Sequence, residues 1–181
     1  MKKLVYFLYN KYFQFYFKIK FHKQINTRDK EIYIFDIDNT VANTWPSFLQ
    51  EYKTLEDRLS SLAVFYNMRN YILNIKYSGS KVFFLTARPY STYNLTFKWL
   101  NDMGLIETKK FLFLVSKPYD KVKMLKQVKN KKIFFYDDMT YNHEQGEIKY
   151  YKNEIKQLKK IQNIEYFDVK FINKIIGGYN E

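Results

Sequence analysis

"EIYIFDIDNT", Glu31 to Thr40, is the stretch that decides the fold, because an apolar run ends there in two aspartates one residue apart. A short, continuously apolar run predicts a strand that is buried on both faces, and we expect it to cover residues 31–36. Asp36 and Asp38 then place two like charges at one point. The pair indicates either a polar turn after a strand or a site that needs two carboxylates.

Further strand-like runs follow this stretch and alternate with helical patterns. Strands are expected at residues 81–85, 110–116, 131–138 and 164–169, and helices within 45–77 and at 92–105, 119–130, 154–161 and 170–178. Gly79 and Gly104 are expected to end two of these helices, and Asp120 is expected to cap another. The alternation predicts an α/β fold: a three-layer, Rossmann-like parallel sheet of about five strands with helices on both faces.

Polar side chains follow four of the expected strands, at the edge where a parallel sheet of this kind binds its ligands. Each of them alone is ordinary for a turn. Four carboxylates at one edge repel one another, however, unless a cation lies among them. Hard oxygen ligands of this type suit Mg²⁺. The polar residues at this edge are Asp36, Asp38, Thr86, Lys117, Lys121, Asp137 and Asp138.

A calcium loop is a competing interpretation of "DIDNTVANTWPS", which carries oxygen-bearing side chains at alternate positions near its start. Such a loop needs a glycine at its sixth position and a glutamate at its twelfth. Val41 and Ser47 stand at these positions. The sequence therefore excludes a calcium loop here.

Four motifs in order resemble those of the haloacid dehalogenase (HAD) superfamily of phosphatases and phosphotransferases. "FDIDNT" matches the DxDxT motif, and "FFLTARP" looks like the second motif, a hydrophobic strand that ends in Thr or Ser. "KPYDKVKML" resembles the third, a lysine at a helix start, and "IFFYDD" is similar to the fourth, a strand that ends in acids. The resemblance covers residues 31–138, with the motifs on the expected strand ends.

The resemblance implies a role for each motif residue. Asp36 is expected to be the nucleophile that forms an aspartyl-phosphate, and Asp38 the general acid and base. Thr86 is expected to donate a hydrogen bond to the phosphoryl oxygens, and Lys121 to neutralise charge. The expected Mg²⁺ ligands are Asp36, Asp137, Asp138 and the backbone carbonyl of Asp38.

Two basic residues leave alternatives open. The motif lysine is either Lys121, at the start of a helix, or Lys117, in the preceding loop. We favour Lys121 because the family places this lysine at a helix start, and we assign Lys117 to substrate binding. Arg88, in "TARP", either contacts the substrate together with Thr86 or is a surface arginine beside a turn.

The spacing between the motifs leaves room for a minimal cap at most. Residues 44–68 are expected to form one or two short helices, in which Trp45, Phe48 and Tyr52 share a stripe that either lines the site or belongs to the core. In this superfamily an open site goes with large substrates: nucleic-acid ends, phosphoproteins, lipids or glycans. The arrangement of the motifs is broadly similar to the 3′-phosphatase part of phage polynucleotide kinases. The resemblance to the superfamily implies a phosphorylated substrate as the partner.

The chain divides into a basic, aromatic arm at residues 1–28 and a HAD-like phosphatase domain at residues 29–181. The formal net charge is +13, and residues 1–30 carry +7 of it. The arm is expected to be a helix that contacts a membrane surface or nucleic acid, or packs on its own domain or a partner.

A second function class stays open, in which the chain is a non-catalytic binding module anchored by its arm to a membrane or a protein partner. No apolar run is long enough to predict a membrane span. The absence of cysteine excludes disulfides and thiolate metal sites and is compatible with a reducing compartment. We expect a cytoplasmic protein, peripheral to the inner face of the membrane if the arm binds lipid.

Overall fold

A five-stranded parallel sheet forms the centre of the protein, as the sequence predicts. The computed structural model describes residues 2–26 and 28–177; Met1, Thr27 and Gly178, the last residue of the final expected helix, lie outside them. The strand order is β5-β4-β1-β6-β9, so β1 lies in the middle and is paired on both sides. The strands are β1 (Glu31–Phe35), β4 (Lys81–Thr86), β5 (Leu112–Leu114), β6 (Lys132–Tyr136) and β9 (Ile164–Phe167).

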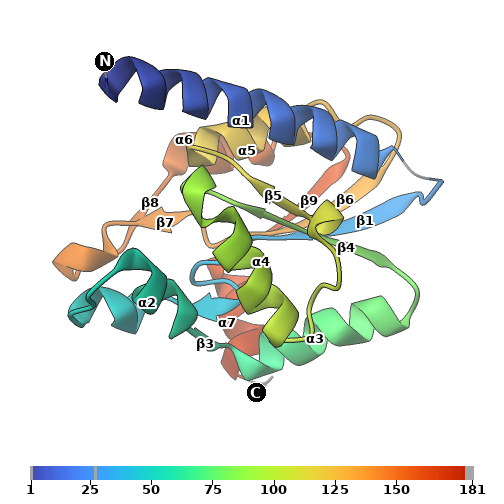
Figure 1. Ribbon diagram of the computed structural model, residues 1–181. Coiled ribbons are helices and arrows are strands. Elements are labelled where there is room, and N and C mark those ends of the chain that lie inside the picture. Colours follow the sequence, from blue (N-terminus) through green and yellow to red (C-terminus); the bar gives the residue numbers. More distant parts are fainter. Residues whose placement is uncertain (1, 27, 178–181) are drawn as a thin grey trace.

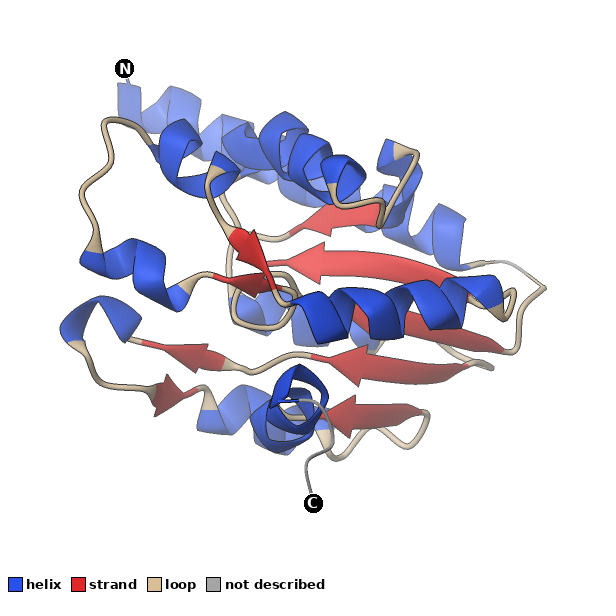
Figure 2. Ribbon diagram, turned by 90° about the horizontal axis from the view of Figure 1, so that it is seen from below, coloured by secondary structure: helices blue, strands red, loops and turns tan. Residues whose placement is uncertain are grey.

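Helices cover both faces of the sheet, which makes the fold a three-layer α/β sandwich (Figure 1). One face carries α1 (Lys2–Ile25), α5 (Pro118–Leu125) and α6 (Lys152–Leu158), and the other carries α3 (Tyr66–Tyr77) and α7 (Val169–Gly177). The view from below shows the strands side by side with their arrowheads in one direction (Figure 2). Because both faces are covered, Ile32, Ile34 and Phe35 of β1 are fully buried.

The expected helix ends are confirmed for two helices and wrong for a third. Gly79 and Gly104 adopt φ of 84° and 70°, directly after α3 and α4 (Tyr93–Asp102). Asp120 does not cap α5: Lys117 occupies the N-cap position, and Pro118 begins the helix. Proline suits the first helical position, because its fixed φ is helical and its missing N–H would have no partner there.

Two short helices form within residues 44–68 as expected, but the stripe predicted on the first of them is wrong. The segment after Thr44 forms a 3₁₀ helix, η1 (Trp45–Leu49), and the chain is extended at Gln50. Tyr52 therefore does not share a helical stripe with Trp45 and Phe48, because the chain leaves the helix before reaching it. The remaining elements are β2 (Ala42–Asn43), α2 (Leu55–Ser60), β3 (Ala63–Val64), η2 (Tyr90–Thr92), η3 (Lys109–Phe111), β7 (Thr140–Tyr141), η4 (His143–Gln145) and β8 (Lys149–Tyr150).

The basic, aromatic N-terminal segment is a helix, and its second half packs on the domain. Phe17, Phe21 and Ile25 are buried, and the Phe21 ring meets Phe113 of β5 edge to face. Lys20 is half-buried and donates hydrogen bonds to the carbonyl oxygens of residues 109 and 112, at 2.6 and 2.9 Å. Burial and, to a smaller extent, the charge of Lys109 lower the pKa of Lys20 to about 8. Among the described residues, no helix has the length and apolarity needed to cross a bilayer.

Candidate active site

The polar residues expected at the carboxyl edge of the sheet converge on one hollow of about 370 Å³. Seven predicted site residues line it, each from the end of a strand or from the loop or helix start that follows one. Arg88 is the predicted site residue that does not line it. The lining residues are Asp36, Asp38, Asn39, Thr86, Ala87, Ser116, Lys117, Pro118, Lys121, Asp137, Asp138, Met139, Thr140 and Tyr151.

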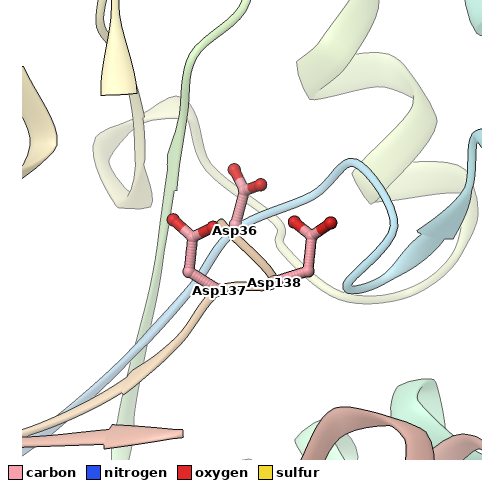
Figure 3. A group of neighbouring side chains, drawn as sticks. All are labelled: Asp36, Asp137 and Asp138. Carbon is pink, nitrogen blue, oxygen red and sulfur yellow. The ribbon is translucent and has the colours of Figure 1, made fainter. Parts of the chain in front are cut away.

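Three buried aspartates form the centre of this site (Figure 3). Asp36 follows β1, Asp137 and Asp138 follow β6, and their carboxylates point to the same side. One carboxylate oxygen of each lies within 4.8 Å of the others. Because β1 and β6 are paired in register through Phe35 and Tyr136, the chain cannot separate these charges without breaking the sheet.

Lys121 balances part of the charge. Its Nζ lies 2.8 Å from Oδ1 of Asp36 and 2.7 Å from Oδ2 of Asp137. Burial alone would lower the pKa of Lys121, but the two carboxylates raise it above its usual value. Lys121 thus lies among the acids, whereas Lys117 is exposed at the rim of the hollow.

Burial and the remaining negative charge raise the pKa values of Asp36 and Asp138. Burial is the main cause for Asp36, and Asp137 and Asp38 add to it, so that the pKa reaches about 7 against the pull of Lys121. Burial, then Asp137 and Asp36, also raise the pKa of Asp138 well above its usual value. With all three acids ionised, Lys121 leaves the cluster with a net charge of about −2. This donor set of carboxylates fits a divalent cation such as Mg²⁺.

Asp38 is separate from this cluster and is held by Arg88. Arg88 donates from Nε to Oδ2 at 2.8 Å and from Nη2 to Oδ1 at 2.6 Å, and Thr44 donates to Oδ1 at 2.9 Å. Burial would raise the pKa of Asp38, but the guanidinium and its hydrogen bonds hold it below its usual value. Arg88 is only 4% exposed, so it is not a surface arginine. Its contact with a substrate stays a prediction, since its donors meet Asp38.

Thr86 ends β4 inside the hollow. Its side chain is fully buried, and within residues 2–26 and 28–177 its Oγ1 has no hydrogen-bond partner. An unpaired buried hydroxyl costs free energy, so such groups in folded proteins mark a place for a ligand or water. The hydroxyl is therefore available to a ligand in the hollow.

Two strained turns hold the acid pairs, and the sequence reasoning did not identify them. Asn39 and Met139, directly after Asp38 and Asp138, adopt φ of 54° and 48°. Oγ1 of Thr40 accepts a hydrogen bond from the backbone N–H of Asp138 at 3.3 Å and so joins the two turns. Asn39 and Thr40 belong to the "DIDNT" motif, which gave the only signal for their role.

The predicted cap segment stays outside the hollow, since none of residues 44–68 lines it. The ring of Trp45 packs against His143, with 4.9 Å between centroids, and Phe48 stacks on the same ring. His143 in turn forms hydrogen bonds with Asn39 and Thr140. Trp45 and Phe48 thus support the turns beside the site and do not line its entrance.

Solved structures share this fold, whereas no protein-family model and no curated protein sequence matches the chain. The class C acid phosphatase from Bacillus anthracis is similar with a TM-score of 0.53 and 14% identity, over 90% of this chain and 83% of that chain. Its tungstate-bound form gives 0.52 and 14%, over 85% and 78%. A chain of the Pnkp1/Rnl/Hen1 complex gives 0.52 and 15%, over 80% of this chain and 47% of that chain, so this chain spans about half of it. At these identities the likeness establishes the fold alone, an α/β fold that this chain shares with the acid phosphatase.

Proposed function

We propose that this protein is a Mg²⁺-dependent phosphatase that hydrolyses a phosphomonoester through an aspartyl-phosphate on Asp36. The observation that carries the proposal is the buried, unpartnered hydroxyl of Thr86, which lines one hollow with Asp36 and Lys121. A phosphoryl group placed there would accept from Thr86 and from the ammonium of Lys121. Both donors are fixed before the substrate arrives, which is the arrangement that stabilises developing charge most effectively.

The residues divide the chemistry between them. The carboxylate of Asp36 attacks phosphorus, the bond to the leaving oxygen breaks, and Asp38 supplies the proton that this oxygen takes up. Asp38 then takes a proton from water, which attacks the aspartyl-phosphate, releases inorganic phosphate and restores Asp36. Arg88 fixes the direction of the Asp38 carboxylate and stabilises its ionised form, which favours the second step and opposes the proton donation of the first.

The metal ligands proposed for this chain are Asp36, Asp137 and Asp138, together with the backbone carbonyl of Asp38. When bound, Mg²⁺ would neutralise the carboxylates and polarise the phosphoryl oxygens. Lys121 lies on the Asp36 and Asp137 side of the cluster, where it keeps two of the ligands in place.

The proposed substrate is large, because the segment that would cap the site does not line it. A nucleic-acid end, a lipid, a glycan or a phosphoprotein fits this requirement. A non-catalytic binding module is the weaker candidate, since Asp36, Asp38, Thr86 and Lys121 all line one hollow.

An aryl phosphate assay tests the proposal. We expect the purified protein to release phosphate when Mg²⁺ is present, and we expect Asp36→Asn to reduce the rate to background, because an amide is not a nucleophile here. Asp102→Asn is the matched control, since Asp102 is exposed on α4. Equal rates for wild type and Asp36→Asn would show that Asp36 is not the nucleophile.

A further inference from the structure

Helix α1 exposes an apolar stripe, between residues 4 and 19, on the side that faces away from the domain. Ten of the eighteen exposed large hydrophobic residues in the described chain belong to α1. Phe13, Phe17 and Phe21, spaced by four residues, pack on the domain. Five other side chains also recur at helical spacing on the outward side, and each is more than half exposed: Leu4, Leu8, Tyr12, Phe15 and Ile19. We name these five residues the outer stripe.

The surroundings of the outer stripe are basic. Residues 1–28 contain no aspartate or glutamate, the exposed Lys11 and Lys18 flank the stripe on one side, and Lys3 is exposed near the N-terminal end of the helix. A helix with a broad apolar, aromatic face and lysines beside it is suited to lie in the interface of an anionic bilayer. The charge of α1 is thus complementary to an anionic lipid surface.

The same helix lines a second hollow beside the catalytic one. Its N-terminal end lies toward the carboxyl edge of the strands (Figure 1). A second hollow of about 730 Å³ opens between this end of α1 and α5, and Tyr6, Phe7 and Lys11 line it. Ala87, Ser116 and Lys117 line both hollows, so the second lies directly beside the catalytic one. If α1 lay on a membrane, a lipid headgroup at that surface would approach the site past the aromatic and basic side chains of the second hollow.

Other occupants fit the outer stripe less well. A second copy of this chain would bring lysines against lysines, because the helix offers no acid to pair with them. Single-stranded nucleic acid stacks on aromatic rings, whereas Leu4, Leu8 and Ile19 give it nothing to stack on. Aliphatic side chains mixed with tyrosine and phenylalanine are what a bilayer interface accepts.

We propose that the outer stripe of α1 docks the protein on an anionic membrane surface, and that the substrate is a phosphomonoester lipid in that surface. The identity of the substrate rests on the proposed phosphatase function, whereas the docking does not. The helix would lie flat in the interface, since it is too polar to cross the bilayer.

Vesicle cosedimentation of the full chain tests the docking. We expect binding to phosphatidylcholine vesicles that contain phosphatidylglycerol, weaker binding to phosphatidylcholine alone, and binding at least roughly tenfold weaker for Leu8→Asp/Tyr12→Asp. Both side chains are exposed, so the variant should fold, which its thermal unfolding checks. The matched control is Tyr66→Asp/Tyr77→Asp, which changes two exposed tyrosines on α3, across the sheet, and should bind like wild type. Equal binding of all three proteins would overturn the docking.

Three further measurements decide between the occupants. The first two look for a dimer in the absence of lipid and for a complex with an oligonucleotide. If either forms with the wild type and is abolished by Leu8→Asp/Tyr12→Asp, the outer stripe binds that partner and the proposal is overturned. Hydrolysis of vesicle-borne phosphatidate should fall in this variant while its aryl phosphatase rate is unchanged. Aryl phosphatase activity without vesicle binding would refute the docking alone. Vesicle binding without any phosphatase activity would refute the proposed function and, with it, the lipid substrate.

Discussion

Lys121 is the residue on which the charge balance of the site depends. Its side chain contacts both Asp36 and Asp137, and all three side chains are buried. A buried ion pair contributes little net stability, but removing one partner leaves the others without compensation. The same contacts orient the proposed nucleophile, so stability and activity should change together at this position.

Replacing each candidate lysine by methionine separates their roles. We expect Lys121→Met to lower the free energy of unfolding by about 3–5 kcal/mol and to abolish aryl phosphatase activity, because two buried carboxylates lose their counter-charge. Lys117→Met is the control at an exposed position, with a stability change within about 0.5 kcal/mol. Denaturant unfolding and the phosphatase assay measure both. A larger loss of activity in Lys117→Met would reverse the assignment of the motif lysine.

At the scale of elements, α1 has two halves with different environments. The second half belongs to the core through Phe17, Phe21 and Ile25, and the hydrogen bonds of Lys20 tie it to η3 and β5. The outer stripe runs from Leu4 to Ile19 along the opposite side of the helix, so it extends into the second half as well. The boundary between a separate arm and the domain, expected near residue 28, therefore remains a prediction, and part of the helix already packs as a domain element.

Two phenylalanines on this helix distinguish its two sides. Phe21 is fully buried against Phe113, so Phe21→Ala should lower the free energy of unfolding by about 3–5 kcal/mol. Phe15 is 65% exposed on the outer stripe, and Phe15→Ala should change it by less than about 0.5 kcal/mol. Urea unfolding of the two variants measures the difference. Equal stabilities would mean that α1 does not pack on β5 in solution.

At the scale of the whole molecule, the sheet holds mutually repelling carboxylates together at one edge. β1 and β6 are neighbours, so their loops bring Asp36, Asp137 and Asp138 together whether or not a cation is present. Burial and then this repulsion raise the pKa values of Asp36 and Asp138. A cation that binds only the folded chain should therefore stabilise the whole fold.

Thermal unfolding with and without Mg²⁺ checks this coupling. We expect Mg²⁺ to raise the unfolding temperature, with a gain of about 2.7 kcal/mol when its concentration is a hundred times the dissociation constant. Asp138→Asn should keep or raise the stability without Mg²⁺, since it removes a buried like charge, and should gain less from Mg²⁺. Asp102→Asn should behave like wild type. The same Mg²⁺ effect in all three proteins would place the binding site elsewhere.

Local patterns were sufficient for the sheet, its helices and the residues at its edge. Secondary structure depends largely on residues that are close together in the chain, and these can be identified directly in a sequence. Examples are the apolar run at residues 31–35 and the glycines Gly79 and Gly104. The predictions that fail concern features for which the local sequence favours two alternatives almost equally. The sequence predicts Asp120 as a helix cap, but the helix begins about one turn earlier, at Pro118. The two-residue strands β7 and β8 are too short to produce a recognisable sequence pattern.

The sequence by itself determined the parallel sheet, the central place of the strand before Asp36, and the gathering of its acids at one edge. Only the tertiary structure decided how the charges pair: Lys121 lies between Asp36 and Asp137, while Arg88, 50 residues away from Asp38 in the chain, binds that carboxylate. It also decided which side of α1 is buried. The physical reason is that periodicity and propensity act along the chain, whereas charge pairing and burial depend on distances through space.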